Sequence, residues 1–83
     1  MTKEEIESKV RTVLAEQLAV DEGMVTREAR FAEDLNADSL DMTEAVLVLE
    51  DELGVSIPEE EMESVKTVGQ AFDLVASKLG ASV

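Results

Sequence analysis

The stretch from Phe31 to Val65 contains twelve acidic residues and no basic one, and so carries most of the chain's net charge of −13. Such a composition is typical of disordered segments. Leu, Val and Met nevertheless recur through the same stretch at helical spacing, which favours folded helices with an acidic outer face. Repulsion among the carboxylates opposes the compact state, so we expect added salt to stabilise the fold. Divalent cations should stabilise it as well, by non-specific binding and not at a defined metal site.

A chain of 83 residues and 9.0 kDa allows one compact domain over residues 1–83, and its 45% apolar content is enough for a core. The chain has no Cys and no His, which excludes disulfide frameworks, thiolate metal sites, Cys or His nucleophiles and imidazole switches. Its acidity argues against nucleic-acid binding. No apolar run approaches the roughly 20 residues that span a bilayer, and no signal peptide is visible. We expect a monomeric cytoplasmic domain with basic partners and no stable membrane insertion.

Apolar spacing and capping residues predict an all-α four-helix bundle with a short third helix and a long loop between the first two helices. The first helix is expected from about residue 3 to 18, because Thr2 and Glu5 form a capping box before an apolar stripe. That stripe comprises Ile6, Val10, Val13, Leu14 and Leu18. Residues 20–37 show no sustained period and include a break at Gly23. We expect Phe31 and Leu35 to hold this loop against the core.

The other three helices also have recognisable ends. Asp38 is a good N-cap with Asp41 at the N3 position and Gly54 is a C′ stop, which predicts a helix over residues 39–53. Pro58, in the first turn, indicates a short helix to about residue 64. Thr67 begins a further capping box, and an apolar stripe follows it before Gly80: Val68, Ala71, Phe72, Val75 and Leu79.

The predicted second helix has two apolar faces. Five residues cluster within about 100° on a helical wheel, the width of a core stripe: Met42, Ala45, Val46, Leu49 and Leu53. Leu40 and Leu47 fall on the opposite side beside Glu44 and Asp51, with Thr43 and Glu50 on one flank. This outward pair fits a docking surface for a basic partner. The pattern alone also allows the pair to pack under the long loop or against a neighbouring helix.

Ser39 is the one plausible position for covalent chemistry. It lies one residue past an N-cap aspartate, where free backbone N–H groups and the helix dipole favour an attached phosphate. Ordinary capping explains an Asp-Ser pair equally well. Asp34-x-Asn36-x-Asp38 resembles the opening of a calcium-binding EF-hand loop, but that loop requires Gly at Ser39 and Glu at Ala45. The EF-hand interpretation therefore fails.

The sequence resembles bacterial acyl carrier proteins, most closely the stand-alone carriers of fatty acid synthesis. The resemblance covers nearly the whole chain and is carried by Glu4–Ile6, Val25–Thr26, Glu33–Asp41, Glu44, Glu50–Glu52, Gly54–Glu60 and Thr67–Gly69. It implies that a phosphopantetheinyl transferase attaches 4′-phosphopantetheine from coenzyme A to Ser39, beside the acidic Asp38. Acyl chains would then be carried as thioesters on the arm's thiol. The chain would be a carrier and not a catalyst.

The resemblance also implies a docking face and an acyl pocket. Residues of the second helix would dock onto basic patches of fatty acid synthesis enzymes: Leu40, Thr43, Glu44, Leu47, Glu50 and Asp51. The acyl chain would enter beside Ala45 and Leu49, in a pocket that includes Ala45, Val46, Leu49, Val65 and Ala71. A larger residue at position 45 should then reduce acyl-chain burial. The chain departs from the family pattern at Asn36, commonly Gly, at Thr43, commonly aliphatic, and at Ala45, commonly Leu.

Two other functions remain open. The chain could serve a polyketide, nonribosomal or D-alanine-transfer pathway, although the Asp38–Asp41 run and the dense acid on the second helix favour fatty acid synthesis. From a different class, it could be an acidic helical adaptor that binds a basic protein and uses Ser39 only near a helix cap. Substitution of Ser39 by Ala would distinguish the adaptor, which keeps its function, from a carrier, which loses it.

Overall fold

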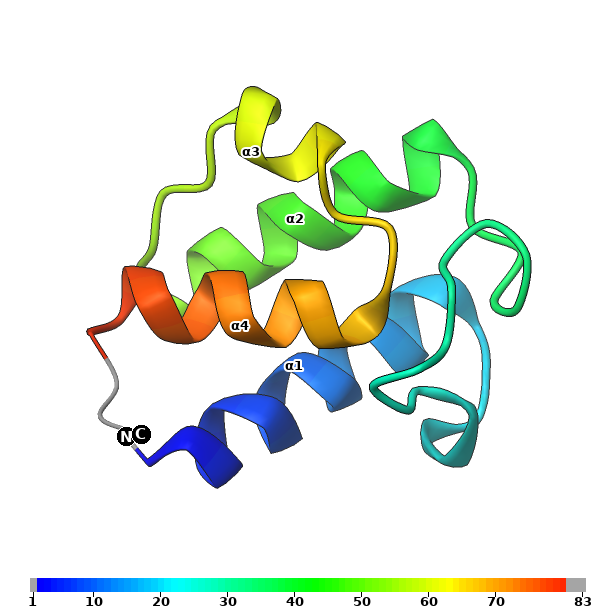
Figure 1. Cartoon of the computed structure of the whole chain (residues 1–83), viewed down its shortest axis with the longest axis horizontal. Helices are drawn as coiled ribbons and strands as arrows, with labels where there is room; N and C mark the ends of the chain where they lie inside the picture. Colours follow the sequence, from blue (N-terminus) through cyan, green and yellow to red (C-terminus); the bar gives the residue numbers. More distant parts are fainter. Residues whose placement is uncertain (1, 81–83) are drawn as a thin grey trace.

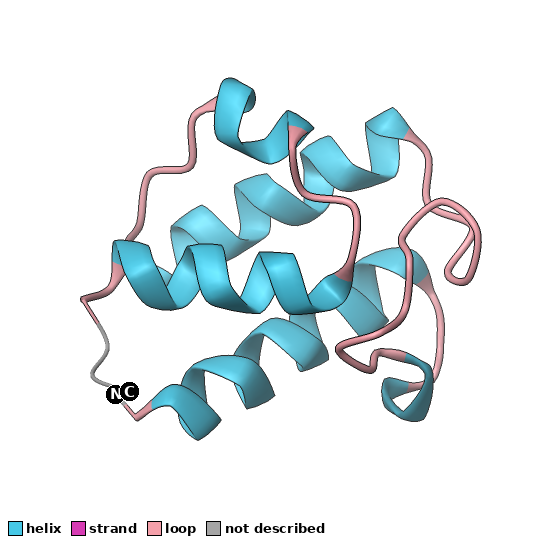
Figure 2. Ribbon diagram, in the orientation of Figure 1, coloured by secondary structure: helices cyan, strands magenta, loops and turns pink. Residues whose placement is uncertain are grey.

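The computed structural model describes residues 2–80 and is built from helices connected by loops (Figure 1). These elements are α1 (Lys3–Leu18), a 3-10 helix η1 (Glu22–Met24), α2 (Ser39–Leu53), α3 (Glu59–Glu63) and α4 (Val68–Lys78). The all-α four-helix prediction is confirmed, including the short third helix and the long first loop (Figure 2). Two local predictions were wrong. Gly23 lies within η1 and not in a break, and Pro58 caps α3 from outside its first turn.

Three of the four helices begin with the capping boxes that the sequence predicts. The side-chain oxygens of Thr2, Asp38 and Thr67 accept hydrogen bonds from N3 backbone N–H groups at 3.2, 2.8 and 3.3 Å. In each box the N3 side chain also accepts a bond from the N-cap N–H. Because the first N–H groups of a helix have no intrahelical partner, these bonds determine where each helix starts.

The helix ends also lie close to their predicted positions: α1 and α2 end at Leu18 and Leu53 as expected, and α3 ends at Glu63, one residue before the expected end. Gly54 ends α2 in the left-handed conformation, with φ 65°, as the sequence indicates. The end of α1 uses the same conformation at Ala19, with φ 55°. A left-handed conformation is unfavourable for a residue with a Cβ atom by about 1–2 kcal/mol. The sequence predicts the end of α1 at Leu18, but no Gly or Asn marks the left-handed conformation of Ala19, whose N–H donates to the Ala15 carbonyl.

The long first loop is part of the core. Phe31 and Leu35 are each 3% exposed, which confirms that they hold the loop against the helices. The backbone N–H of Phe31 donates to the Lys66 carbonyl at 3.1 Å, and the N–H of Val68 donates to the Ala29 carbonyl at 2.9 Å. These bonds fasten the loop to the start of α4. The loop therefore delivers the chain to α2 along a fixed path.

An ion-pair cluster closes one side of the bundle. The Arg27 guanidinium contacts Glu7 of α1 at 3.1 Å and Asp73 of α4 at 3.0 Å. It also lies 5.8 Å from the ring centroid of the buried Phe72, and the Arg11 guanidinium lies 5.4 Å from the same centroid. Cation–π contacts at such distances add to the ion pairs. Loop, α1 and α4 are thus tied together at one place.

The opposite side of the bundle is more open. Helix α1 packs closely against both α2 and α4, whereas no Cα atom of α3 lies within 8 Å of a Cα atom of another helix. The Cα atoms of α2 and α4 are also more than 8 Å apart, although both helices carry small side chains, Ala45 and Ala71, that would permit a closer approach. The space between α2, α3 and α4 is therefore filled by side chains alone.

Gly69 provides a test of how tightly the loop meets α4. A Cβ atom there would lie 3.0 Å from the Arg27 carbonyl oxygen, which accepts a hydrogen bond from the Gly69 N–H itself. The carbonyl cannot move away without losing that bond, so Gly69→Ala should lower the free energy of unfolding by about 1 kcal/mol. The matched control is Gly23→Ala, because a Cβ atom at Gly23 meets nothing within 4 Å. Urea denaturation measures both variants, and equal stabilities would contradict the close contact.

Candidate functional site

Ser39 is the first residue of α2, and its side chain is exposed. Within residues 2–80 its hydroxyl makes no hydrogen bond, while its carbonyl accepts one from the Thr43 hydroxyl at 2.9 Å. Asp38 is occupied differently, because it exchanges two hydrogen bonds with Asp41 across the helix start. The aspartate therefore maintains the helix end and leaves the adjacent hydroxyl free to be modified. The geometry fits a phosphate bound at a helix N-terminus.

The turn that leads to Ser39 requires an unusual backbone conformation. Asn36 has φ 55°, in the left-handed region. Immediately after it the N–H of Ala37 donates to the Phe31 carbonyl at 2.8 Å and closes the turn. Glycine is the residue best suited to this conformation, and Asn is one of the few others that adopt it readily. The departure from the family pattern at Asn36 is thus compatible with the same turn.

Asp34 closes the preceding part of the loop. One of its carboxylate oxygens accepts hydrogen bonds from the Arg30 backbone N–H at 2.8 Å and from the Arg30 guanidinium at 3.3 Å. The backbone bond, more than the side-chain bond, lowers the pKa of Asp34 below its usual value of 3.8. This carboxylate therefore stabilises the backbone of the loop through its hydrogen bond with the Arg30 N–H. Among the residues that the structure describes, no cluster of three His, Cys, Asp or Glu could hold a metal ion.

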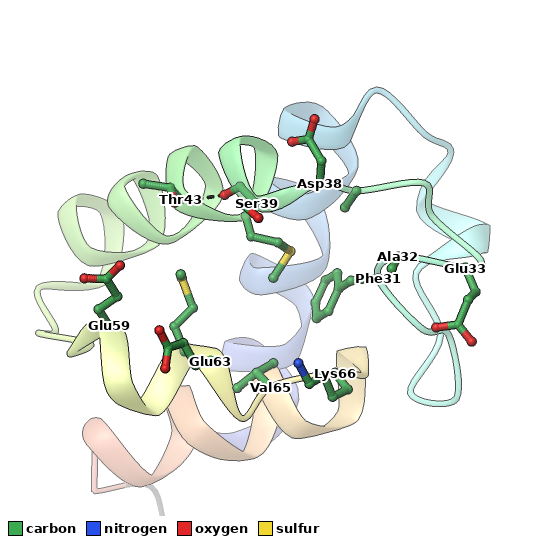
Figure 3. Close-up of a pocket in the computed structure, with 13 residues that line it drawn as sticks. Phe31, Ala32, Glu33, Asp38, Ser39, Thr43, Glu59, Glu63, Val65 and Lys66 are labelled. Carbon is green, nitrogen blue, oxygen red and sulfur yellow. Dashed lines mark hydrogen bonds between the residues drawn. The ribbon is translucent and has the colours of Figure 1, made fainter.

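A groove of about 640 Å³ opens beside Ser39, between α2 and α3. Figure 3 shows Asp38, Ser39 and Thr43 on one wall and Glu59, Glu63, Val65 and Lys66 across from them. We call it the outer groove; its full lining is Phe31, Ala32, Glu33, Ala37, Asp38, Ser39, Met42, Thr43, Glu59, Met62, Glu63, Val65 and Lys66. The groove is broad, open and rimmed by charge.

Beside this groove lies a small, partly open cavity that is lined by apolar side chains. Its volume is about 20 Å³, which is large enough for one water molecule but offers it no polar partner. We call it the inner cavity; it is lined by Leu14, Phe31, Met42, Ala45, Val46, Leu49, Ile57, Met62, Val65, Ala71, Leu74 and Val75. All five residues that the sequence suggests for an acyl pocket are in this lining. The structure brings them together, and their role remains a prediction.

The outer face of α2 is as the helical wheel predicts. Leu40 and Leu47 are 65% and 59% exposed, so the alternative in which they pack under the loop or against a helix is wrong. Thr43, Glu44 and Asp51 are also exposed. Single exposed apolar side chains are common, but two on one acidic helix face form a candidate docking surface.

Glu50 differs from the rest of the predicted docking set. It is half-buried, and its carboxylate accepts a hydrogen bond from the Ile57 backbone N–H at 2.7 Å. Glu50 therefore holds the connection between α2 and α3 in addition to adding charge to the surface. Nothing in the sequence marks this bond, because its two partners are seven residues apart and belong to different segments.

The comparisons with known proteins agree with this geometry. The family model described as "Phosphopantetheine attachment site" matches residues 8–75. Two proteins named acyl carrier protein align over 81 residues, which is 98% of this chain and 100% of each relative. The protein from Thermosynechococcus vestitus (strain NIES-2133 / IAM M-273 / BP-1) is 51% identical, and that from Guillardia theta is 42% identical.

A solved structure supports the same assignment. The thermally stable acyl carrier protein from Enterococcus faecalis superposes with a TM-score of 0.77 at 40% identity, over 94% of this chain and 99% of that one. The fold and the site thus define a phosphopantetheine-dependent carrier domain. The chain belongs to the acyl carrier protein family. It is a carrier and not a catalyst, and its cofactor is phosphopantetheine.

The lowered pKa of Asp34 gives a pH-dependent test of the loop before Ser39. Because the folded state lowers this pKa, Asp34 contributes stability that is complete above the unfolded value of 3.8 and disappears as the pH falls through the folded pKa. Asp34→Asn should therefore be less stable than the wild type at neutral pH, and the difference should shrink in acid below about pH 3.8. Urea denaturation of both proteins across this range measures the difference, and a gap that stays constant with pH would contradict the assignment.

Proposed function

We propose that Ser39 carries 4′-phosphopantetheine and that the chain transports fatty acyl groups on this arm between the enzymes of fatty acid synthesis. The single observation that carries the proposal is the exposed Ser39 hydroxyl at the start of α2, which makes no hydrogen bond within residues 2–80 and lies beside a groove of about 640 Å³. Family membership supplies the cofactor. The arm supplies the terminal thiol that a chain without Cys lacks.

The chain's own residues would position this arm and present it to partners. Asp38 and Asp41 keep the start of α2 rigid, so the hydroxyl of Ser39 stays at a fixed place beside the groove. Leu40 and Leu47 would supply apolar contact with a partner, and the surrounding carboxylates would attract its basic residues. Exposed charge pairs of this kind give fast, weak and salt-sensitive association. A carrier that visits many enzymes requires this behaviour.

The inner cavity is the proposed shelter for the acyl chain. It has an apolar lining, and it lies where α2, α3 and α4 are separated by side chains alone. The small residues Ala45 and Ala71 line it. At about 20 Å³ the cavity is much smaller than a fatty acyl chain, so loading would require side chains or α3 to move.

Three further points stand as predictions beside this function. Residues 1–83 are proposed to form one carrier domain, which the continuous core of the described residues supports. The transferase and the fatty acid synthesis enzymes are the proposed partners. A cytoplasmic location is also proposed; among residues 2–80, no helix is long and apolar enough to cross a membrane.

Carriers of polyketide, nonribosomal or D-alanine pathways would share the same arm and the same helical bundle. Identification of the acyl group that the protein carries would distinguish these pathways from fatty acid synthesis.

Attachment at Ser39 is tested by intact mass. Incubation of the unmodified protein with coenzyme A, magnesium and a broad-specificity phosphopantetheinyl transferase should add one phosphopantetheine unit to the wild type. Ser39→Ala should add none, and it should remain folded because the hydroxyl makes no hydrogen bond within residues 2–80. Circular dichroism checks the fold of the variant. Mass gain on Ser39→Ala, or none on the wild type, would overturn the assignment.

The docking face is tested by charge reversal. Glu44→Lys and Asp51→Lys place repulsive charges on the exposed face of α2, and each should lower kcat/KM for loading by the transferase roughly three- to tenfold. Glu16→Lys makes the same change in net charge on the exposed surface of α1 and serves as the matched control. Raising the salt concentration should reduce the difference. Equal effects from all three substitutions would show that net charge alone, and not this face, governs recognition.

A further inference from the structure

The outer groove is acidic but contains a single amine. One basic side chain lines it, that of Lys66, together with four acidic ones: Glu33, Asp38, Glu59 and Glu63. Lys66 is also the first basic residue after the acidic stretch from Phe31 to Val65. Figure 3 shows Lys66 across the groove from Ser39. A group attached to Ser39 and lying in this groove would therefore meet one cationic hydrogen-bond donor.

The amine of Lys66 differs from most other cations of the chain in having no partner. Four basic side chains lie within 4.0 Å of a carboxylate: Lys9, Arg27, Arg30 and Lys78. Arg11 instead donates to the Val25 carbonyl at 3.1 Å. The exposed side chain of Lys66 makes neither an ion pair nor a hydrogen bond within residues 2–80, although Glu63 lines the same groove three residues earlier. Its donors are therefore available to a ligand.

The backbone of Lys66, in contrast, is held on both sides. Its N–H donates to the Gln70 side-chain oxygen at 2.6 Å, and its carbonyl accepts the bond from the Phe31 N–H at 3.1 Å. Phe31 is itself buried in the core. A ligand that binds the amine would have to order only the side chain of Lys66 and not the surrounding loop, which lowers the entropic cost of binding.

The charges of the groove indicate what kind of ligand the amine can bind. Glu33 is paired with Arg30 at 2.7 Å, and Asp38 is bonded to the start of α2. Glu59 and Glu63 are exposed and make no side-chain hydrogen bond or ion pair within residues 2–80. Two such carboxylates against one amine disfavour an anionic ligand in this part of the groove. A neutral ligand with a strong hydrogen-bond acceptor fits better, because an ammonium group only donates and its bonds are charge-assisted.

The phosphopantetheine arm contains such acceptors. Its phosphate would be joined to the Ser39 oxygen and would stay at the start of α2. Between the phosphate and the terminal thiol lie two amides, whose carbonyl oxygens are the strongest neutral acceptors of the arm. The N–H group of an amide can in turn face a carboxylate. The wall of the groove opposite Ser39 offers both kinds of partner, in Lys66 and Glu63.

We propose that Lys66 positions the arm by donating a hydrogen bond from its ammonium group to an amide carbonyl of phosphopantetheine in the outer groove. This inference rests on the proposed attachment at Ser39 and adds to it a residue of this chain that orients the arm. It does not involve the inner cavity. An oriented arm presents its thiol from a restricted set of directions, so less conformational freedom is lost when a partner receives it.

The contact is tested by nuclear magnetic resonance of a labelled arm. Phosphopantetheine labelled with ¹³C and ¹⁵N is transferred to Ser39 from labelled coenzyme A, and intact mass confirms loading. The carbonyl ¹³C shift and the ¹H–¹⁵N heteronuclear NOE of each arm amide are compared with those of the same coenzyme A free in solution. In the wild type, one carbonyl should move to higher frequency, and the NOE of its amide should rise because the amide is ordered.

Substitutions at position 66 identify the donor. Lys66→Met removes the charge and all donors, and it should return both amides to their free values. Lys66→Arg keeps the charge and the donors and should retain the displaced signal. Lys9→Met is the matched control, because it removes the same charge from the exposed surface of α1 and lines neither the groove nor the cavity. Thermal midpoints of the unloaded proteins check the fold, and Lys66→Ala replaces a Met variant that is destabilised.

The outcomes separate failure of this contact from failure of the proposed function. If the loaded wild type has free-like values at both amides, arm positioning is overturned and attachment stands. A displaced signal that persists in Lys66→Met shows that another group is the donor, and equal losses in Lys66→Met and Lys9→Met show an effect of net charge; either result overturns the role of Lys66. If Ser39 cannot be loaded, attachment itself fails, and the inference fails with it.

Discussion

The reciprocal hydrogen bonds between Asp38 and Asp41 are the interaction on which the site depends. They satisfy the free N–H groups at the start of α2 and make the helix begin at Ser39 and not a turn later. Ser39 is therefore the first residue of α2. The free hydroxyl lies at this helix start. The exposed leucines and the inward alanine take their directions from the helical period together with the burial of Ala45 and Leu49.

Much of the fold was predictable because its signals are local. Three capping boxes lie within four residues each, and the apolar stripes repeat every three or four residues, so both can be read directly from the chain. The exposure of Leu40 and Leu47 follows from the same periodicity. Contacts between distant segments were not predictable. The bond from Ile57 to Glu50 and the Arg27 cluster both depend on where the tertiary structure places each partner.

The candidate site likewise has a part that local sequence signals predict and a part that only the tertiary structure shows. Ser39 and the docking face were accessible to sequence analysis because they lie on one helix and because the family resemblance marks them. The groove and the cavity required the structure, since their walls come from the loop, α2, α3, α4 and, for Leu14, α1. The five residues suggested for the acyl pocket do line one cavity, but Met42 and Met62 were absent from that set. Met42 was assigned only to the core stripe, and no pattern in the sequence links it to Met62.

The unequal packing of the bundle has a consequence for how partners recognise the protein. The proposed docking face is on α2, which packs closely against α1, while no Cα atom of α3 lies within 8 Å of a Cα atom of another helix. If an acyl chain enters the proposed pocket, α3 would be displaced more easily than α2. The exposed face of α2 would then keep its shape, whereas the surface of α3 would change with the cargo. An enzyme that contacts α2 alone would accept any loaded form, and one that also reaches α3 would be able to distinguish an empty carrier from a full one.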